Sequence, residues 1–269
     1  MKITHHVKVV QNNNIEVFMK KHFALLIFPL LLSSQVFASN LKDLSSGNIR
    51  PARTDKMIAL TFDDGPTAKT TKAILRTLKK YNISATFFVI GQKAEDRLDI
   101  LQQQVDEGHI VANHSLSHKY LGRLSRWGFK KKVKSEFFGC HDIIKDYMGN
   151  GKNLYYRAPG ASWKEKAAKI INKYEIGREY IGPVLWDIGG ELYKNRQGVY
   201  TTAADWACWS KGLSVESCLK GYINRTKRTN GGIVLMHDIS MKTSQMLEKY
   251  IPALLKMGYT FVTLDEMDL

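Results

Sequence analysis

MIALTFDDGP, residues 57–66, places two carboxylates and a turn directly after an apolar run. Residues 57–62 combine β-branched, aromatic and small apolar side chains, which is typical of a buried strand bounded by turn residues. Asp63 and Asp64 follow where that strand would end, and Gly65-Pro66 would turn the chain away from it. The stretch therefore predicts a buried strand that presents a pair of carboxylates at its C-terminal end.

The rest of the chain repeats this alternation of short apolar runs and helical patterns. Further strands are expected at residues 85–90, 110–112, 154–156, 180–188, 233–236 and 260–264. Helices are expected at residues 68–80, 93–107, 127–147, 164–174, 214–228 and 243–257. Strands that alternate with helices indicate an α/β fold with a parallel sheet. About seven such units in one domain, residues 56–269, favour a closed or nearly closed (β/α) barrel.

Composition excludes several classes of protein. With 44% hydrophobic and 24% charged residues, the 269-residue chain has enough apolar surface to fold, which excludes an intrinsically disordered protein. The 20 Gly and 6 Pro follow no period, which excludes a collagen-like or low-complexity chain. The formal net charge of +15 suggests nucleic acid or an anionic surface as a partner, but it carries no information about the fold.

Residues 1–38 are interpreted as an N-terminal extension followed by a secretory signal peptide. Two lysines precede a ten-residue apolar run, residues 23–32, and small residues end the segment at Ala38. We expect translation to start at Met19 and cleavage to follow Ala38, with residues 39–55 as a polar lead-in at the surface. An uncleaved membrane anchor is the alternative, although the run is shorter than the about 20 apolar residues of a spanning helix.

Export changes the interpretation of the charge and of the cysteines. Residues 1–38 contain four Lys and one Glu, so the remaining chain carries +12. An exported protein is not expected to bind nucleic acid, whereas association with an anionic cell-envelope surface is plausible. In an oxidising compartment the three cysteines can form one bridge in three ways. We favour a disulfide between Cys208 and Cys218, which flank a short loop, with Cys140 free; three buried thiols are the alternative.

Four of the expected strands end in residues that can carry chemistry. In parallel barrels, active-site groups lie at the C-terminal ends of the strands. We therefore expect these residues to share one rim of the barrel. In chain order they are Asp63-Asp64, Asn113 to His118, Arg157 to Gly160, and His237-Asp238.

The spacing of two histidines on this rim suggests a metal site. His114 and His118 are four residues apart, so one helical turn would present both imidazoles to a common ion. Asp64 supplies a hard oxygen; either carboxylate of Asp63-Asp64 could bind, with the other free for proton transfer. Two His and one Asp with an open fourth position match a catalytic zinc site, so we predict a divalent metal and expect Zn²⁺. A surface helix with two solvated histidines is the alternative, which the Asp-Asp-Gly-Pro turn disfavours.

These motifs resemble those of the polysaccharide deacetylase family, the NodB-homology domain of carbohydrate esterase family 4. Thr61 to Pro66 is similar to the first family motif, and Gly108-His109 with Asn113 to His118 is similar to the second. Arg157 to Gly160 resembles the third motif, and Leu235 to His237 resembles the fifth. The resemblance covers nearly all of the expected domain. It implies a distorted (β/α) barrel that removes an N- or O-linked acetyl group from a sugar.

The resemblance also implies a role for each matching residue. The implied metal ligands are Asp64, His114 and His118. Asp63 would be the general base, held by Arg157, which keeps its proton and can only orient or stabilise. His237 would be the general acid, because a cationic imidazole can protonate a leaving amine near neutral pH. Leu235 would line the acetyl pocket.

Two positions depart from the family pattern. Gly160 stands where the third motif commonly has an aromatic residue, so a backbone N–H remains for the substrate but the ring is lost. The fourth motif is split by residues 192–204, which we interpret as an insertion. We assign the carboxylate that tethers His237 to Asp205, with Asp187 as the alternative. Aromatic residues around the insertion could stack on sugar rings or pack the loop onto the barrel: Tyr193, Tyr200, Trp206 and Trp209.

The sequence thus predicts an exported, metal-dependent hydrolase that acts on an acetylated glycan. A non-catalytic carbohydrate-binding protein on the same fold is the alternative, and a basic protein that only binds anionic envelope polymers is a third hypothesis. The remaining candidate residues are expected to have little or no part in the chemistry. The run Lys130 to Lys132 with Lys134 is taken as a solvated helix face, and His109 and His141 as structural histidines; Asp238 is given a minor site role.

Overall fold

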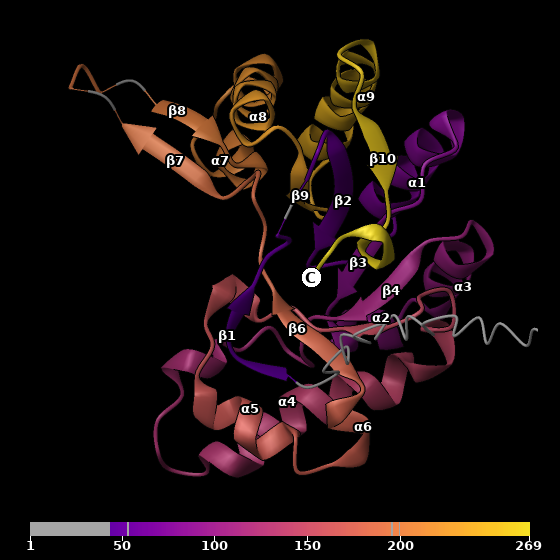
Figure 1. The fold of residues 1–269 in the computed structure, drawn as a ribbon, viewed down its shortest axis with the longest axis vertical. Helices are drawn as coiled ribbons and strands as arrows, with labels where there is room; N and C mark the ends of the chain where they lie inside the picture. Colours follow the sequence, from indigo (N-terminus) through magenta and orange to yellow (C-terminus); the bar gives the residue numbers. More distant parts are fainter. Residues whose placement is uncertain (1–43, 53, 195, 199) are drawn as a thin grey trace, which may run out of the picture. The chain divides into compact units, whose positions relative to one another are not determined.

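In this computed structural model, strand β2 (Met57–Asp63) is the central strand of its sheet, and it is buried from its second residue onward. It pairs in parallel with β9 (Gly232–His237) along nearly its whole length. Near its start it also pairs with β10 (Thr260–Val262), and near its end with β3 (Thr86–Val89). The buried apolar run read from the sequence is therefore the central strand (Figure 1).

Two parallel sheets make up the barrel. Strand β4 (Ile110–Asn113) extends the β2 sheet beyond β3. The second sheet has the order β1 (Leu44–Ile49), β6 (Tyr180–Val184), β5 (Leu154–Tyr155). Isolated parallel bridges, Asn113 to Tyr156 and Ile188 to Val234, connect the two sheets on either side. The arrangement is that of a distorted (β/α) barrel, as predicted, with ladders that are interrupted at the two junctions.

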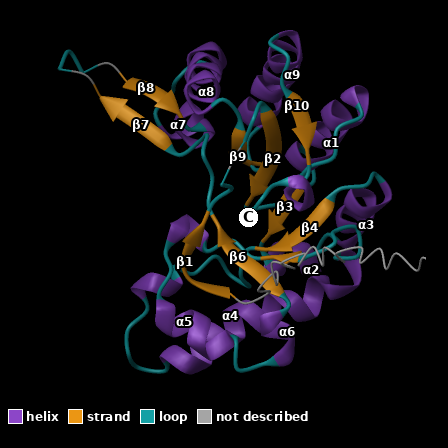
Figure 2. Cartoon of the chain, in the orientation of Figure 1, coloured by secondary structure: helices purple, strands orange, loops and turns teal. Residues whose placement is uncertain are grey.

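Helices surround the sheets, as Figure 2 shows. Those between the first strands are α1 (Thr70–Tyr81), α2 (Gly91–Glu95), α3 (Leu98–Asp106) and α4 (Phe129–Ile144). The next are α5 (Glu165–Ile171), α6 (Glu175–Arg178) and α7 (Asp205–Ser210). The last are α8 (Val215–Thr229) and α9 (Met241–Lys256). Within the described part of the chain, none of the helices combines the length and the apolar character needed to cross a membrane.

The alternation of side chains along β2 divides the core into two layers. Ile58, Leu60 and Phe62 pack into the cluster between the strands and the helices. Ala59 points the other way, into a smaller cluster inside the barrel. Because side chains alternate with a period of two, Asp63 belongs to the inward set and reaches the rim from inside the barrel.

The structure describes residues 44–269 except residues 53, 195 and 199. The expected signal peptide and the first part of the lead-in lie outside these residues. The remainder of the lead-in is not merely polar surface, because it contains β1, whose Leu44 is buried. Leu44 N–H donates to Asn172 Oδ1 and the Asn172 amide donates to the Leu44 carbonyl, so β1 is tied to the end of α5.

Two further elements differ from the sequence expectation. The helix expected at residues 93–107 is interrupted, because Arg97 leaves helical geometry with φ of −144° between α2 and α3. The expected insertion forms an antiparallel hairpin of β7 (Glu191–Lys194) and β8 (Tyr200–Ala203), which projects from the barrel in Figure 1.

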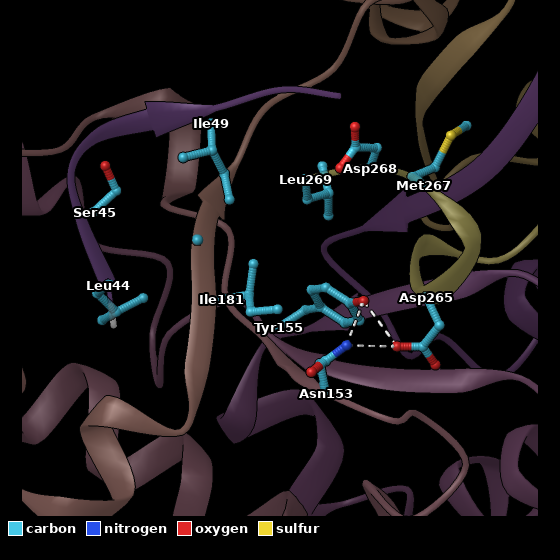
Figure 3. Close-up of a pocket in the computed structure, with 11 residues that line it drawn as sticks. Leu44, Ser45, Ile49, Asn153, Tyr155, Ile181, Asp265, Met267, Asp268 and Leu269 are labelled. Carbon is cyan, nitrogen blue, oxygen red and sulfur yellow. Dashed lines mark hydrogen bonds between the residues drawn. The ribbon is translucent and has the colours of Figure 1, made fainter. Parts of the chain in front are cut away.

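A cavity of about 540 Å³ lies beside the starts of β5 and β6 and the last residues of the chain (Figure 3). Its polar wall is a small network: the Tyr155 hydroxyl donates to Asp265 Oδ1 over 2.8 Å, and the Asn153 amide donates to the same oxygen over 3.2 Å. None of the predicted site residues lines this cavity. The C-terminal residues therefore lie beside the starts of β5 and β6, away from the strand ends that carry the motifs.

Candidate active site

The turn after β2 separates its two carboxylates. Asp64 has a left-handed backbone, with φ of +75°, so its side chain leaves the alternation of the strand that Asp63 completes. Gly65 then passes directly over Asp238, and a Cβ at Gly65 would lie 2.0 Å from Asp238 Oδ2. Only glycine fits this turn, and the turn directs Asp63 and Asp64 to different partners.

Asp64 meets the two histidines predicted as metal ligands. Asp64 Oδ1 lies 3.0 Å from His118 Nε2 and 3.4 Å from His114 Nε2. The three ligand atoms lie within 4.8 Å of one another. His114 Nδ1 donates to the carbonyl of Arg157 over 2.8 Å, which leaves its Nε2 free as a ligand.

The chemistry of this cluster fits a divalent metal. Asp64 Oδ1 is buried and accepts no hydrogen bond from the described part of the chain, although both imidazole nitrogens are close to it. Burial raises the pKa of Asp64, but the imidazoles of His114 and His118 outweigh this and hold the pKa well below its usual range. An ionised carboxylate oxygen that lies beside two imidazole nitrogens is suited to share an ion with them.

The histidines do not lie on a helical turn, contrary to the expectation from their spacing. After β4 the chain forms an irregular loop in which Ser115 and His118 have positive φ values of 70° and 60°. Glu136 on α4, itself buried, anchors this loop: it accepts from Ser117 N–H over 2.9 Å and from Ser117 Oγ over 2.7 Å. A tertiary contact, not helical periodicity, therefore brings the two imidazoles together.

Arg157 and Asp63 form a buried pair beside the cluster. Arg157 Nη1 donates to Asp63 Oδ1 and to Thr61 Oγ1, each over 2.7 Å, and Arg157 Nε donates to the Val184 carbonyl. The Arg157 side chain is 1% exposed. Burial lowers the pKa of Arg157, while the Asp63 carboxylate opposes that change. Because Arg157 occupies only one Asp63 oxygen among the described contacts, the orientation of the carboxylate is fixed and its second oxygen faces the cluster.

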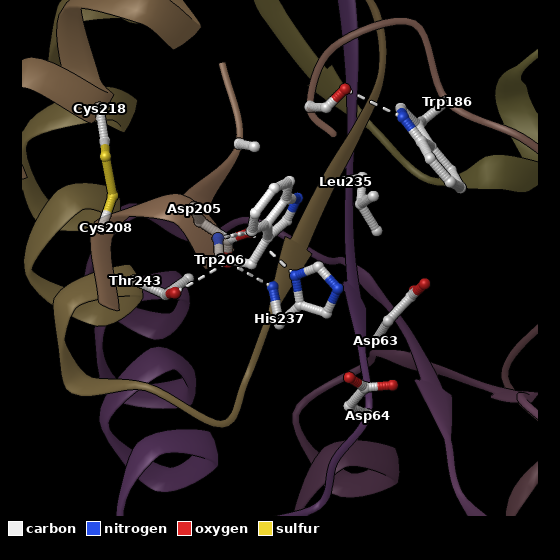
Figure 4. Close-up of polar contacts among 12 residues, drawn as sticks. Asp63, Asp64, Trp186, Asp205, Trp206, Cys208, Cys218, Leu235, His237 and Thr243 are labelled. Atoms are coloured by element: carbon white, nitrogen blue, oxygen red, sulfur yellow. Dashed lines mark hydrogen bonds and ion pairs between the residues drawn. A yellow bond between two sulfur atoms is a disulfide. The ribbon is translucent and has the colours of Figure 1, made fainter. Parts of the chain in front are cut away.

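His237 at the end of β9 is held by Asp205 rather than by Asp187. Asp205 Oδ1 lies 2.9 Å from His237 Nδ1, and Asp205 Oδ2 accepts from His237 N–H and from Thr243 Oγ1 (Figure 4). Asp187 instead accepts from the N–H of Ile233, near the start of β9 and four residues before His237. Burial lowers the pKa of His237, but the Asp205 carboxylate outweighs this and raises it to about 9.

A cavity of about 270 Å³ unites these groups. Every predicted metal ligand and substrate residue lines it, as do Asp63 and His237, whereas Arg157 and Asp205 lie buried behind them. Tyr193, on the projecting hairpin and 59% exposed, is not part of it, nor is Tyr200. The complete lining is Asp63, Asp64, His114, His118, Tyr120, Gly160, Trp186, Trp206, Leu235 and His237.

Two lining residues were not predicted from the sequence. The Tyr120 ring covers Gly160, where a Cβ would lie 2.9 Å from Tyr120 Cε1. A ring from a different loop therefore occupies the space beside the residue that lacks an aromatic side chain. Tyr120 also lies edge-on to His118, with 5.7 Å between the ring centroids. The sequence feature that could have identified Tyr120 is its position two residues after the predicted ligand His118. Trp186, the other unpredicted residue, is anchored by its indole N–H to the Gly189 carbonyl.

A disulfide joins Cys208 on α7 to Cys218 on α8, and Cys140 is free and buried. Helix α7 also carries Asp205 and Trp206. The bridge therefore attaches the short helix that holds His237 to a longer neighbouring helix (Figure 4).

Comparisons with known proteins agree with this site. A family model described as "Polysaccharide deacetylase" matches residues 50–177. The chain is 32% identical over 217 residues to the peptidoglycan-N-acetylglucosamine deacetylase PgdA of Listeria monocytogenes, which covers 80% of this chain but only 40% of that protein. It is 30% identical over 216 residues to a peptidoglycan-N-acetylglucosamine deacetylase of Bacillus cereus, covering 79% of this chain and 88% of that protein.

Among solved structures, the Bc1960 peptidoglycan N-acetylglucosamine deacetylase superposes with a TM-score of 0.64 at 26% identity, covering 81% of this chain and 91% of that one. The match with the Bacillus cereus protein spans most of both chains. The family-model match, residues 50–177, includes the strand ends that carry Asp63, His114 and Arg157. On sequence, fold and site geometry, the chain belongs to the polysaccharide deacetylase family.

Proposed function

We propose that this protein is a metal-dependent hydrolase that removes acetyl groups from an N-acetylated glycan, with O-acetylated glycans as chemically related substrates. One observation carries the proposal: a three-residue ligand cluster, a carboxylate held by a buried Arg and a His held by a buried Asp all meet in one cavity. The names of the related proteins, which are peptidoglycan deacetylases, support an N-acetylated cell-wall glycan as the substrate class.

Asp64, His114 and His118 would hold the metal, for which we propose Zn²⁺ because two imidazoles and one carboxylate form the type of ligand set that catalytic zinc uses. When bound, a divalent metal supplies Lewis-acid polarisation of the acetyl carbonyl and lowers the pKa of water.

Asp63 is proposed as the general base. Its carboxylate is held by Arg157 through one oxygen, and the other oxygen lies 3.7 Å from His114 Nε2 and faces the ligand cluster. A water molecule that attacks the acetyl carbon from this cluster would give its proton to that oxygen. Arg157 cannot replace Asp63 in this role, because a guanidinium does not release its proton.

His237 is proposed as the general acid. Asp205 keeps the imidazole cationic and fixes Nδ1, so Nε2 is the atom that can donate a proton. The leaving group after attack on an N-acetyl group is an amine, which must be protonated as the carbon–nitrogen bond breaks. In Figure 4 His237 lies between Asp205 and the carboxylates of Asp63 and Asp64, which suits proton transfer across the cavity.

The apolar part of the cavity suits a small acyl group on a sugar. Leu235 is 4% exposed, and its remaining surface lines the cavity beside His237, where the acetyl methyl group would lie. Trp186, Trp206 and Tyr120 present aromatic rings at the same cavity, and such rings pack against sugar faces.

Acetate release tests the proposal directly. We expect the protein to release acetate from at least one of chitin oligomers, poly-N-acetylglucosamine, peptidoglycan and acetylxylan, and to lose this activity in the presence of a chelator. The Asp63→Asn variant should bind the same glycan without releasing acetate, because the amide cannot accept the proton. Glycan binding by the native protein without acetate release from any of these polymers would favour a non-catalytic carbohydrate-binding protein.

We also propose that the protein acts outside the cytoplasm. The signal-like residues 19–38 and the disulfide between Cys208 and Cys218 support export, because disulfides persist in oxidising compartments. The proposed partner is the acetylated glycan itself. Cell fractionation with an antibody against the native protein would test the location.

A further inference from the structure

A third hollow, of about 600 Å³, is lined mainly by basic side chains. Five basic side chains line it together with Gly128 and Phe129, and none of the acidic residues that the structure describes does. The basic residues come from the loop before α4, from the first turns of α4 and from the start of α5: Arg126, Lys130, Lys131, Lys134 and Lys166. The lysine run is therefore more than a solvated helix face, because the fold adds Arg126 and Lys166 to it.

This cationic hollow (Arg126, Lys130, Lys131, Lys134 and Lys166) is not neutralised by the rest of the molecule. Among the described residues, none of the five forms an ion pair with a carboxylate. The first turn of α4 contains no acidic residue, although acidic residues are favourable there and cations are not. The Lys134 ammonium lies over the Tyr174 ring at 4.7 Å, and the Lys166 ammonium lies over the Phe129 ring at 5.4 Å. Aromatic rings, not carboxylates, thus support these cations.

The positive charges of the hollow act on a neighbouring tyrosine. The neighbouring Lys134 ammonium lowers the pKa of the Tyr174 hydroxyl, and the charges of Lys130 and Lys173 lower it further. The hollow therefore favours the anionic form of a group beside it. A carboxylate or phosphate brought to the hollow by a ligand would meet the same field.

The topology places this hollow on the rim that carries the candidate active site. In a (β/α) unit, the helix begins at the rim where the preceding strand ends. Strand β4 ends at Asn113, and the same connection carries His118 and Tyr120 before α4 begins at Phe129. Strand β5 is followed by Gly160 and then by α5 with Lys166. Both connections that build the cationic hollow thus also line the catalytic cavity.

The surface between the catalytic cavity and the cationic hollow is suited to a sugar chain. Arg123 lies over the Tyr120 ring at 5.0 Å, and Tyr120 itself lines the catalytic cavity. Trp127, beside Arg126, is 90% exposed and presents its indole to the solvent. Exposed aromatic rings and cations together match a polymer that has both sugar faces and anionic groups.

We propose that the cationic hollow is a subsite for the anionic groups of the glycan, so that the preferred substrate is an acetylated glycan bearing carboxylates along its chain. This inference rests on the proposed deacetylase function. A glycan strand whose acetyl group lies at His237 would extend over Tyr120 and Arg123 and would place a neighbouring carboxylate at Lys130, Lys131 or Lys166. Specificity for an acidic polymer would then reside outside the catalytic cavity.

The test compares two acetylated oligomers of equal length: neutral chitin oligomer, and an oligomer of alternating N-acetylglucosamine and N-acetylmuramic acid. The variant Lys130→Gln/Lys131→Gln/Lys166→Gln removes three exposed cations of the hollow. We expect the ratio of kcat/KM for the acidic oligomer to kcat/KM for the neutral one to fall about tenfold, mostly through KM for the acidic oligomer. Added salt should lower the same ratio in the native protein, because exposed charges are screened.

The matched control is Lys80→Gln/Lys227→Gln/Lys256→Gln. These lysines are also exposed, and they lie in the last turns of α1, α8 and α9, at the opposite rim. The control changes the net charge by the same amount and should leave the ratio within twofold of the native value. An equal fall in both triple variants, or no fall in the first, would overturn the proposal.

Two further measurements separate this inference from its alternatives. If the first triple variant loses binding to phosphatidylglycerol vesicles while the substrate ratio stays constant, the hollow binds a membrane surface and the proposal is wrong. Calorimetric binding of both oligomers to the Asp63→Asn variant, with and without the three lysine substitutions, tests the subsite without turnover. A native protein that releases no acetate would contradict the proposed function, while weaker binding of the acidic oligomer on lysine substitution would still support the subsite.

Discussion

At the scale of single residues, two adjacent carboxylates obtain different partners from backbone geometry alone. Asp63 follows the alternation of β2 into the barrel and meets Arg157, whereas Asp64 takes a left-handed conformation and meets His114 and His118. Without the family resemblance, the sequence could not indicate which of the two carboxylates would face the metal, because both residues are aspartates. The distinction is made by one φ angle and by the absence of a side chain at Gly65.

The first prediction concerns the pH dependence of the reaction. Asp205 raises the pKa of His237 to about 9, above the ordinary value of 6.5, so the acid form is fully present below pH 6.5 and is lost as the pH rises through about 9. In the Asp205→Asn variant, burial would lower the pKa of His237 without the opposing carboxylate. The alkaline limb of the kcat/KM profile should therefore move down by about 2 pH units.

The control for this profile is Asp187→Asn, which alters the other aspartate of the split motif without touching His237. Its alkaline limb should coincide with that of the native protein. An unshifted limb in Asp205→Asn would mean that a group other than His237 supplies the proton.

The second prediction concerns the turn after β2. Gly65→Ala would bring a Cβ within 2.0 Å of Asp238 Oδ2, and Asp238 is buried and bonded to Thr71, so it has little room to move. We expect the free energy of unfolding to fall by about 1–3 kcal/mol. Chemical denaturation measures this change. Gly149→Ala, where nothing lies within 4 Å of the added Cβ, is the matched control and should be close to neutral.

At the scale of secondary-structure elements, loops that are held by a neighbouring helix or strand position the chemistry. The loop that carries His114 and His118 has two residues with positive φ and depends on α4 for its shape. The residues around Asp205 depend in a similar way on the disulfide to α8. Spacing along the chain could not predict these conformations, because the contacts that stabilise them come from residues that are distant in sequence.

The third prediction tests this dependence at Glu136. Its carboxylate accepts two hydrogen bonds from Ser117 and forms an ion pair with Lys119, and Glu136 itself lies outside the cavity. Glu136→Gln keeps the shape of the side chain but has only one acceptor oxygen, so the loop should loosen and the affinity for Zn²⁺ should fall about tenfold or more. Competition against a chromophoric chelator measures this affinity.

Glu191→Gln is the control for Glu136, because it removes a carboxylate that is paired with Arg225 and Arg228 beside the hairpin. Its affinity for Zn²⁺ should equal that of the native protein. If Glu136→Gln bound Zn²⁺ as tightly as the native protein, the loop would not need α4 for its ligand geometry.

At the scale of the whole molecule, the barrel joins four separate strand ends into one cavity. Strands β2, β4, β5 and β9 are held together by ladders and by the isolated bridge between Asn113 and Tyr156. A ligand that connects the ends of two of these strands should therefore stabilise the entire fold, because it binds the native state only.

The fourth prediction follows from this linkage. Saturation with Zn²⁺ should raise the midpoint of thermal unfolding by about 5 °C or more over the chelator-treated protein, as expected for a ligand well above its dissociation constant. Calorimetric scans with and without chelator measure the shift. The Asp64→Ala variant, which lacks one of the three ligands, should show little of it; a full shift in this variant would place the bound ion elsewhere.

Most of the strands and helices, and most of the residues at the site, could be predicted from the sequence. Buried strands such as 57–62 are recognisable because their apolar residues are adjacent, and the residues that follow them must lie at one rim when the strands are parallel. The polar segment of β1 was not predicted as a strand, because its pairing with β6 and not its own composition makes it one.

Which of these residues contact one another depends on the tertiary structure. It selected Asp205 over Asp187 for His237, replaced the expected helical turn at His114 and His118 with a loop held by Glu136, and placed Tyr120 over Gly160. It also gathered Lys166 with the lysines of α4. The physical reason is the same in each case: local patterns record the preferences of adjacent residues, whereas these contacts depend on packing between segments that are far apart in the chain.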